Sequence, residues 1–282
     1  MEPLHAKYCL IGHPLGHSLS PFIHARLFAM QQREEEYALV DLAPEELTDA
    51  FSGRLRTISG CNVTIPYKQS VLPFCGRLEG KAALYKTVNC MAFTPDGSVG
   101  YNTDADGFLC ALKAAALPLA GRVLLLGCGG VGTMFACEAA MAGCDVWLYD
   151  AISYEKATAL ASRVRELAPT VSCTALETLP EDMAFDLLIN ASPVGMYPHV
   201  DACPVSEALI GRCQAVFDAV YNPRETVLVR TAKERGIPAG GGMAMLVWQA
   251  VVAHQYWYGA QFENEAIDRL IDDCYTELDK QF

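Results

Sequence analysis

The sequence predicts an α/β protein whose mainly parallel sheets are covered by helices, and three observations lead to this prediction. Short apolar runs that end in glycine or polar residues alternate with stretches of helical periodicity. The 282 residues are 52% hydrophobic and 19% charged, as expected of one large or two modest packed domains. A glycine-rich turn directly follows one of the apolar runs, as it does in doubly wound folds.

The N-terminal part of the chain follows a β-α-β-α-β order. An apolar run over 7–12 predicts a buried strand, and residues 21–32 follow proline with apolar side chains at helical spacing. Residues 34–42 alternate enough for a second strand, 43–55 read as a helix ended by glycine, and 58–68 as a strand that leads into a loop. This order predicts a mainly parallel sheet.

A second α/β unit is predicted in the middle of the chain. The segments that we expect to be strands are 122–126, 145–150, 185–192 and 215–221, with helices at 133–144 and 153–167. A Gly-rich hinge at 239–242 then precedes C-terminal helices over 243–282. The apolar stretch 243–260 contains two glutamines and a histidine, so it indicates a buried or interface helix rather than a membrane span.

Charge and composition argue against several kinds of partner. The net charge is −12, the pI is near 4.9 and no long basic run occurs, so we expect no nucleic-acid partner. His13, His17 and His24 have no acidic partner at metal-ligand spacing, so we expect no metal site.

The cysteines indicate a reducing compartment. None of the 12 cysteines forms a CxxC pair, and several lie inside apolar runs, which favours buried, reduced thiols. The N-terminus has no basic leader followed by a long apolar segment. We therefore expect a cytoplasmic protein without a membrane anchor.

The sequence GCGGVG at 127–132 predicts a dinucleotide site. It follows a predicted strand, opens a predicted helix and precedes Asp150 at the end of the next strand, which is the context that the G-x-G-x-x-G pattern requires. Gly127 would allow the turn, Gly129 the approach of a pyrophosphate and Gly132 tight packing of helix on strand. Gly130 and Val131 would lie at the helix N-terminus, where free N–H groups and the helix dipole favour phosphate.

Asp150 predicts which dinucleotide is bound. Its carboxylate could accept hydrogen bonds from the adenosine ribose hydroxyls but would repel a 2′-phosphate, and Lys156 is the first positive charge that follows. We therefore predict NAD as the cofactor, with NADP less favoured. The alternative is that Asp150 caps a helix or ends its strand in solvent.

Lys68 and Asp104 are candidates for acid/base chemistry. Lys68 ends the sequence NVTIPYK, and Asp104 lies in the turn-rich sequence GYNTDADGF. A carboxylate beside a lysine would orient the ammonium group, and desolvation would lower the pKa of that lysine. Spacing alone does not pair them, because Lys68 could equally be a surface lysine and Asp104 a turn-forming residue.

The order of these motifs resembles the shikimate/quinate dehydrogenase family. The segments GHPLGHSLSPFIH, NVTIPYK, VNC, GYNTDADGF, GCGGVG, NASPVGM, VYNP and GGGMAMLVWQA all look like signatures of that family, and they span residues 12 to about 250. The resemblance implies that Lys68 and Asp104 are the catalytic pair, with Lys68 exchanging the hydroxyl proton as hydride moves to or from the nicotinamide.

The resemblance also implies the binding residues. Ser18 and Ser20 would hydrogen-bond the substrate carboxylate, since hydroxyl donors orient a carboxylate without a full positive charge. The residues implied to contact the rest of the substrate are Thr64, Asn89, Tyr221 and Gln249. Those implied to border the cofactor beyond the glycine turn are Ser192, Val194, Ala219 and Gly242.

Two domains are implied. The substrate-binding domain would use residues 1–104 with the C-terminal helices 243–282, and the Rossmann NAD-binding domain would use 105–242. The resemblance implies an interdomain cleft that excludes water during hydride transfer.

The chain departs from the family pattern at several positions. Lys86 and Cys90 stand in KTVNC, where the family often reads GAVNT. The family's NRT-like segment, which grips the NADP phosphate, is replaced by DAI at 150–152, which points to the NAD-using branch. Gly241 replaces an Asp or Asn, and Ala244 stands where glycine is common.

These observations predict an NAD-dependent dehydrogenase that interconverts shikimate and 3-dehydroshikimate, with quinate as a further candidate substrate. The alternatives are an NADP-dependent biosynthetic enzyme, a dehydrogenase of an amino-substituted ring and a non-catalytic NAD-binding regulator. The intact set of Lys68, Asp104, Ser18 and Ser20 counts against the regulator. The sequence is compatible with a homodimer and does not fix the oligomeric state, the direction of the reaction or the choice between shikimate and quinate.

Overall fold

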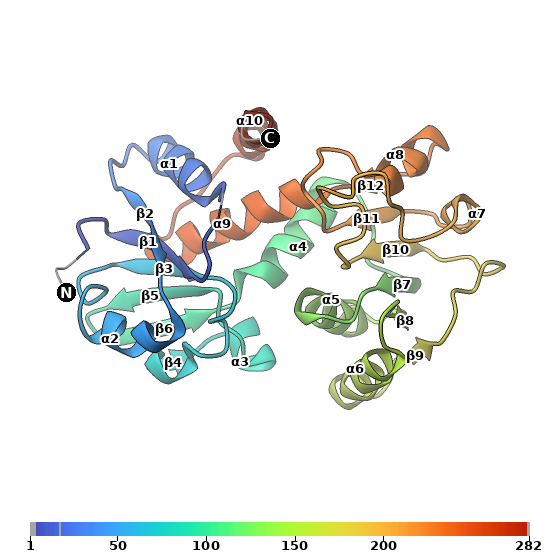
Figure 1. Ribbon diagram of the computed structural model, residues 1–282, viewed down its shortest axis with the longest axis horizontal. Helices are drawn as coiled ribbons and strands as arrows, with labels where there is room; N and C mark the ends of the chain where they lie inside the picture. Colours follow the sequence, from blue (N-terminus) through green and yellow to red (C-terminus); the bar gives the residue numbers. More distant parts are fainter. Residues whose placement is uncertain (1–3, 17, 281–282) are drawn as a thin grey trace. The chain divides into compact units, whose positions relative to one another are not determined.

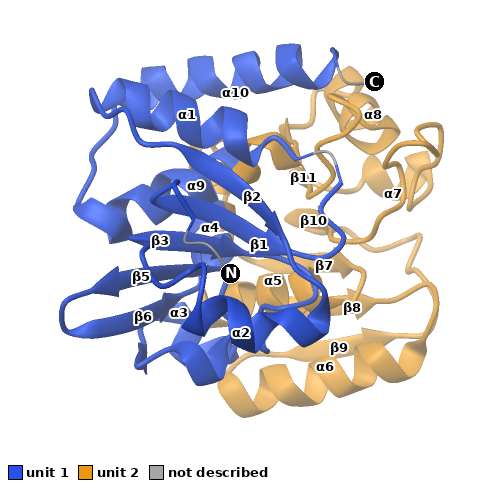
Figure 2. Ribbon diagram, turned by 60° about the vertical axis from the view of Figure 1, so that its left-hand side comes forward, with its two compact units in different colours: residues 1–107, 247–282 blue, residues 108–246 orange. Residues whose placement is uncertain are grey.

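The chain folds into two compact units, coloured separately in Figure 2. The computed structural model describes residues 4–16 and 18–280. Unit 1 comprises Met1–Gly107 and Val247–Phe282, and unit 2 comprises Phe108–Leu246. Two helices, α4 (Thr103–Ala114) and α9 (Gly242–Tyr258), contain residues of both units.

Unit 1 has a six-stranded sheet, and its helices range from single short turns to the 15-residue α10. Its strands are β1 (Tyr8–Gly12), β2 (Tyr37–Asp41), β3 (Gly60–Val63), β4 (Arg77–Leu78), β5 (Cys90–Thr94) and β6 (Gly97–Tyr101). Its other segments are α1 (Ser20–Met30), η1 (Pro44–Glu46), α2 (Leu47–Ser52), η2 (Leu72–Phe74), α3 (Lys81–Tyr85) and α10 (Asn264–Leu278). The helix predicted over 43–55 is thus a 3₁₀ turn followed by a short α-helix.

The sheet of unit 1 is mainly parallel, as predicted, and one of its strands, β5, is reversed. Its strand order is β2-β1-β3-β5-β6-β4 (Figure 1), and β1 pairs in parallel with both β2 and β3. Strand β5 runs antiparallel to β3 and to β6. The cause is the two-residue connection Pro95-Asp96, because so short a link joins only antiparallel strands.

The two faces of this sheet bury separate apolar clusters. One face packs side chains of β1, β3 and β5 against α2, with Ile11, Cys61 and Met91 essentially inaccessible to solvent. On the other face Ala253 and Trp257 of α9 pack on β5 and β6. His24 of α1 is fully buried and stacks on Tyr37.

Unit 2 has the doubly wound architecture that the sequence predicts. Its strands are β7 (Arg122–Leu126), β8 (Asp145–Tyr149), β9 (Cys173–Leu176), β10 (Leu187–Asn190), β11 (Val216–Asp218) and β12 (Ala239–Gly240). Its helices are α5 (Gly130–Met141), α6 (Tyr154–Leu167), α7 (Glu207–Ile210) and α8 (Val227–Glu234). The strand order is β12-β11-β10-β7-β8-β9 and every pairing is parallel.

The strand order of unit 2 reverses between β7 and β10, which is the topological switch point of an open parallel sheet. Ligands of such sheets bind outside the carboxyl ends of the strands at this point. One face of the sheet is covered by α7 and α8, where Leu209 and Leu228 pack on Leu124 and Leu188. A cofactor site is therefore expected at the loops after β7, β8, β10 and β11.

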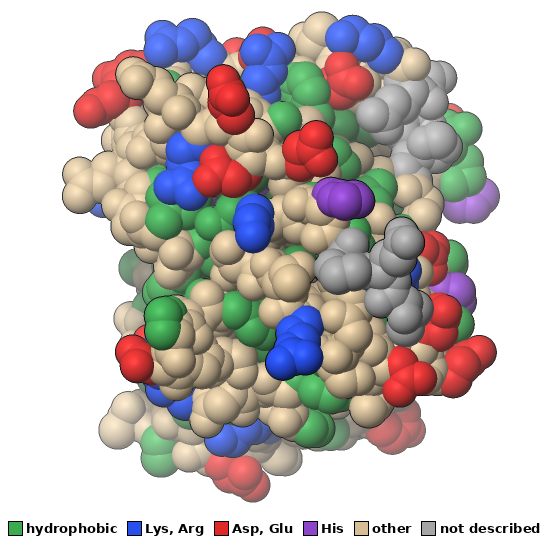
Figure 3. All heavy atoms as spheres, turned by 90° about the vertical axis from the view of Figure 1, so that its left-hand side faces the viewer, with side chains coloured by type: hydrophobic (Ala, Val, Ile, Leu, Met, Phe, Trp, Pro, Cys, Tyr) green, Lys and Arg blue, Asp and Glu red, His purple; other side chains and the backbone are tan. Residues whose placement is uncertain are grey.

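The surface agrees with the acidic composition. On the face shown in Figure 3, Lys and Arg side chains are interspersed with Asp and Glu and form no continuous basic patch. Within the described residues no helix combines the length and the hydropathy needed to cross a membrane. All twelve cysteines lie in the described part of the chain and are free thiols.

Candidate functional site

Several loops of unit 1 meet at one edge of its sheet. Strands β1 and β3 are parallel, so the loops that follow them leave the sheet at the same edge. Strand β5 runs the opposite way and therefore begins at that edge, while β6 ends there. This topology brings together the loop after β1, the loop after β3, Asn89 before β5 and the start of α4.

Lys68 and Asp104 form an ion pair at this edge. The Nζ atom of Lys68 lies 2.6 Å from Oδ2 of Asp104, and the two side chains are 29% and 18% exposed. The backbone of Lys68 is fixed as well, because its carbonyl accepts the N–H of Val88. An oriented ammonium group that stays in contact with solvent can exchange a proton with a bound hydroxyl.

Asp104 belongs to a helix rather than to the predicted turn. Helix α4 begins at Thr103, and the side chain of Asn102 accepts the N–H of Ala105 at 3.4 Å, in the manner of an N-cap. The carboxylate of Asp104 thus lies in the first turn of α4, where the helix dipole favours negative charge.

Thr103 is a site residue that the sequence reasoning missed. It is fully buried, and its N–H donates to Oδ1 of Asn89 at 2.6 Å. Its hydroxyl lies 3.0 Å from Nδ2 of Asn89 and donates to Oε1 of Gln249 at 3.4 Å. Thr103 therefore joins two predicted substrate-binding residues next to the ion pair of Lys68 and Asp104. A threonine that precedes an acidic residue at a helix start was the available signal.

The predicted carboxylate-binding segment lies in the loop after β1. The backbone N–H of Ser20, the first residue of α1, donates to Oγ of Ser18 at 3.2 Å. Thr64 lies beside the end of β1, since its N–H donates to the carbonyl of Ile11. A side chain at Gly12 would come within 2.5 Å of Thr64 Cγ2, so glycine is required for this approach.

The glycine turn of unit 2 has the geometry of a pyrophosphate-binding loop. Gly127 has φ of +92°, a conformation that favours glycine. A Cβ on Gly132 would lie 1.9 Å from the carbonyl oxygen of Gly127, which enforces close packing of α5 on β7. A Cβ on Gly129 or Gly130 would meet nothing within 4 Å, so the space at the start of α5 is open. This loop fits a dinucleotide.

The carboxylate of Asp150 is occupied by backbone donors. Oδ2 accepts the N–H of Cys128 at 2.8 Å, and Oδ1 accepts those of Ile152 and Ser153, both at 3.1 Å. Burial acts to raise the pKa of Asp150, but these donors and the charge of Lys156 outweigh it and hold the pKa below its usual value. Asp150 thus ties the glycine turn to the loop after β8.

The loops after β10 and β11 are joined by a buried polar network. Asn190 accepts the N–H of Ser192 at 3.0 Å and donates to Oδ1 of Asp218 at 2.9 Å. Asp218 is fully buried, and the sequence reasoning did not single it out. Gly242 lies close by, because a Cβ there would come within 2.0 Å of the carbonyl oxygen of Ala219.

The remaining predicted residues lie in the same loops. The N–H of Val194 donates to Oγ of Ser192 at 3.3 Å, and Val131 at the start of α5 is 37% exposed. Tyr221 follows β11 and is 39% exposed, and partial burial raises the pKa of its hydroxyl. The structure thus gathers the predicted substrate residues other than Tyr221 within unit 1, and the predicted cofactor residues and Tyr221 within unit 2.

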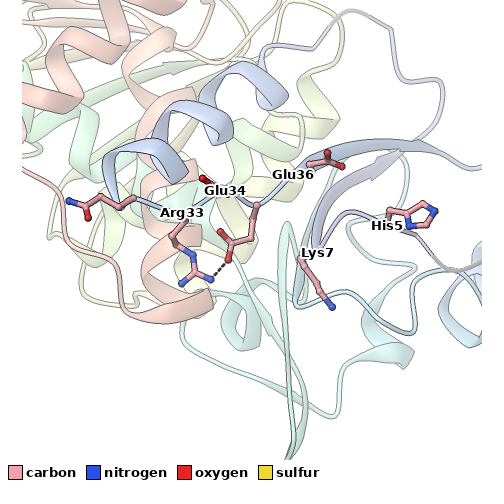
Figure 4. A pocket seen from close by; sticks show the side chains of 7 residues that line it. His5, Lys7, Arg33, Glu34 and Glu36 are labelled. Carbon is pink, nitrogen blue, oxygen red and sulfur yellow. Dashed lines mark hydrogen bonds and ion pairs between the residues drawn. The ribbon is translucent and has the colours of Figure 1, made fainter.

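A separate hollow of unit 1 contains none of the predicted residues. Figure 4 shows its lining, which contains His5, Lys7, Arg33 and a run of glutamates, and Arg33 pairs with Glu35. Among the described residues no three His, Cys, Asp or Glu side chains gather so as to hold a metal ion. His17 lies outside the described residues.

The fold and the two clusters define a class of protein: a two-unit α/β protein with a Rossmann-type dinucleotide unit and, in its other unit, a lysine–aspartate pair suited to proton exchange. Residues 10–91 match the family model of the shikimate dehydrogenase substrate binding domain. Together with the relatives described next, this match shows that the chain belongs to the shikimate dehydrogenase family.

Two relatives and a solved structure illustrate the relationship. The chain is 38% identical over 256 residues to the shikimate dehydrogenase (NADP(+)) of Methanothermobacter thermautotrophicus, covering 89% of this chain and 90% of that protein. It is 34% identical over 261 residues to the enzyme of the same name from Caldanaerobacter subterraneus subsp. tengcongensis, with coverages of 92% and 93%. Shikimate 5-dehydrogenase from Thermus thermophilus, solved with NADP(H) and shikimate, superposes with a TM-score of 0.79 at 30% identity, covering 95% and 98% of the two chains.

These relatives show that the prediction of NAD as cofactor was wrong. Both relatives are named for NADP(+), and the solved structure contains NADP(H). The prediction required the carboxylate of Asp150 to face the adenosine ribose, whereas it accepts three backbone N–H groups. Asp150 therefore joins the glycine turn to the loop after β8, which is neither the helix cap nor the solvated strand end of the alternative interpretation, since the N-cap of α6 is Ser153.

Proposed function

We propose that the protein is an NADP(H)-dependent shikimate dehydrogenase that interconverts shikimate and 3-dehydroshikimate. The observation that carries the proposal is the ion pair of Lys68 and Asp104, 2.6 Å long, at the sheet edge where the loops of unit 1 meet. Family membership and the NADP(H) of the relatives support the cofactor and the substrate. A non-catalytic regulator would not require this pair.

In the proposed chemistry, a residue of unit 1 exchanges the proton of the reacting hydroxyl. NADP(H), when bound, accepts or supplies the hydride. Lys68 takes the proton of the reacting hydroxyl during oxidation and returns it during reduction, while Asp104 orients the ammonium group. Ser18 and Ser20 hold the substrate carboxylate through hydroxyl groups. Thr64, Asn89, Gln249 and Tyr221 are proposed to contact the remainder of the substrate.

The same proposal assigns substrate binding to one domain and dinucleotide binding to the other. Residues 1–104 with 243–282 form the substrate-binding domain, and 105–242 form the dinucleotide-binding domain. The glycine turn holds the pyrophosphate, because its backbone N–H groups and the N-terminus of α5 favour phosphate. Ser192, Val194, Ala219 and Gly242 border the nicotinamide half.

Lys156 is a candidate partner for the 2′-phosphate. Lys156 lies on α6 close enough to Asp150 for its charge to lower the pKa of that carboxyl, and it is exposed. We propose that its ammonium group pairs with the 2′-phosphate. Changing Lys156 to alanine should raise the KM for NADP⁺ about tenfold without a matching change for NAD⁺. An equal change for both cofactors would contradict the assignment.

One experiment tests the function as a whole: initial rates with shikimate and with quinate, each with NADP⁺ and with NAD⁺. We expect shikimate with NADP⁺ to give the largest kcat/KM. If quinate is oxidised with NADP⁺ and shikimate is not, the substrate is quinate. Absence of turnover with shikimate and NADP⁺ in a folded protein would refute the proposal.

A further inference from the structure

Asp218 is a buried carboxylate at the end of β11. Its side chain is fully inaccessible to solvent. Oδ1 accepts the N–H of Val220 at 3.0 Å and Nδ2 of Asn190 at 2.9 Å, and Oδ2 accepts the hydroxyl of Thr226 at 2.7 Å. Every hydrogen bond of this carboxylate therefore comes from a neutral donor.

An asparagine of the same shape would keep most of these hydrogen bonds. Its Oδ1 would accept the N–H groups of Val220 and Asn190, and its amide N–H would face the hydroxyl oxygen of Thr226, which also accepts the N–H of Val229. The hydroxyl proton of Thr226, which is donated to Oδ2 of Asp218, would lose its acceptor. Asparagine would avoid the cost of burying a charge. Aspartate therefore differs from asparagine at this position in its negative charge and in one hydrogen bond.

That charge has no cationic partner in the described part of the chain. No Lys, Arg or His there forms an ion pair with Asp218. The other titratable group beside it is the thiol of Cys203, whose pKa is raised by burial and further by the charge of Asp218. Buried charges are normally paired, so a cationic ligand is the missing partner.

The position of Asp218 identifies the ligand. The glycine turn after β7 and the loop after β8 lie on one side of the switch point, and they receive the pyrophosphate and the adenosine half of a dinucleotide. The other half must then extend over the carboxyl ends of β10 and β11, where Asp218 is the last residue of its strand. The group at that end is the nicotinamide ring, which is positively charged when oxidised and neutral when reduced.

We propose that Asp218 supplies the counter-charge for the oxidised nicotinamide ring and so biases the protein toward NADP⁺ over NADPH. The inference rests on the proposed function, because it takes NADP(H) as the cofactor. It assigns to Asp218 a role that depends on its charge, in addition to its hydrogen bonds to Val220, Asn190 and Thr226.

The test is the ratio of two dissociation constants, measured without substrate. NADP⁺ and NADPH are titrated into the protein at pH 8 by calorimetry, for the unaltered chain, for Asp218→Asn and for Asp150→Asn. We expect Asp218→Asn to weaken NADP⁺ relative to NADPH by on the order of fivefold, as for a partly screened charge pair several ångströms apart. Asp150→Asn, at the adenosine half, should alter both affinities by the same factor.

The outcomes separate this inference from the proposed function. A ratio in Asp218→Asn within twofold of the unaltered protein refutes the inference while leaving the function intact. Failure of the unaltered protein to bind either nucleotide refutes both. Thermal melts establish that each variant is folded, and Asp218→Ser provides a second neutral variant should the asparagine protein not fold.

Discussion

Replacing Asp218 by asparagine should change the free energy of unfolding by an amount that depends on pH in a defined way. Burial raises the pKa of Asp218 from 3.8 to about 6, against the opposing effect of its three hydrogen bonds. The folded state therefore binds this proton more tightly than the unfolded state does. The side chain adds most to stability below pH 4, and this contribution is lost as the pH rises through 6.

The size of the effect follows from that shift. About two pKa units correspond to about 3 kcal/mol of differential stability between the acidic and alkaline limits. Between pH 5 and pH 8 the wild-type side chain should lose about 1 kcal/mol, because part of the titration lies below pH 5. Asparagine at this position does not titrate. The difference in the free energy of unfolding between variant and wild type should therefore grow by about 1 kcal/mol from pH 5 to pH 8.

Urea unfolding followed by circular dichroism at the two pH values measures this difference, and the titration of all other groups cancels in it. Val229→Ala is a suitable control, because it removes buried apolar volume from α8 without changing a titratable group. Its difference from wild type should be the same at both pH values. A pH-independent difference for Asp218→Asn would refute the claim that this buried carboxyl has a raised pKa.

Three further predictions concern Thr103, Asp150 and Lys86. Thr103→Val should raise the KM for shikimate about tenfold, since Asn89 and Gln249 lose a shared partner, and Thr103→Ser should restore it; unchanged kinetics in the valine variant would contradict that role. Asp150→Ala should lower the free energy of unfolding by about 1 kcal/mol at pH 7, as three backbone donors lose their acceptor, and an equally stable variant would argue against the structural role. Lys86 has φ of +53°, so Lys86→Gly should stabilise the protein by up to about 1 kcal/mol in urea titrations, and a loss of stability would show that its side chain makes a compensating contact.

The Rossmann unit could be predicted from sequence because its central strands β7, β10 and β11 are buried on both faces. Runs such as residues 123–126 are then continuously apolar, and the glycine turn adds a local signal that depends on backbone geometry alone. The requirement for glycine at 132 arises from contact with Gly127 only five residues away. Patterns of this kind can be recognised in the sequence without knowing the tertiary structure.

The reversed strand in the sheet of unit 1 was harder to predict. The hairpin of β5 and β6 is formed by segments with cysteine, glycine and serine, which have no clear alternation, although the sequence TPDG at its turn was a usable signal. The pairing of Lys68 with Asp104 depends on an edge shared by antiparallel and parallel strands, and no spacing along the chain encodes it.

The cofactor could not be deduced from Asp150, because the role of a carboxylate depends on what surrounds it. The same residue at a strand end can face a ribose or accept the N–H groups of neighbouring loops, and only the folded backbone distinguishes these cases. Asp218 was missed for the same reason: in sequence it is one acidic residue in the apolar run AVFDAVY, and its burial and its neutral hydrogen-bond partners emerge only when β10, β11 and α8 are packed together.

The most direct test of the account is single-turnover kinetics with Lys68→Ala, compared with wild type, using shikimate and NADP⁺. Because Lys68 is assigned to proton exchange, the account predicts a fall in the rate of NADP⁺ reduction of about 100-fold or more, with the Kd for shikimate within a few-fold of wild type. A variant that reduces NADP⁺ at a rate near that of wild type would contradict the assignment of the catalytic pair.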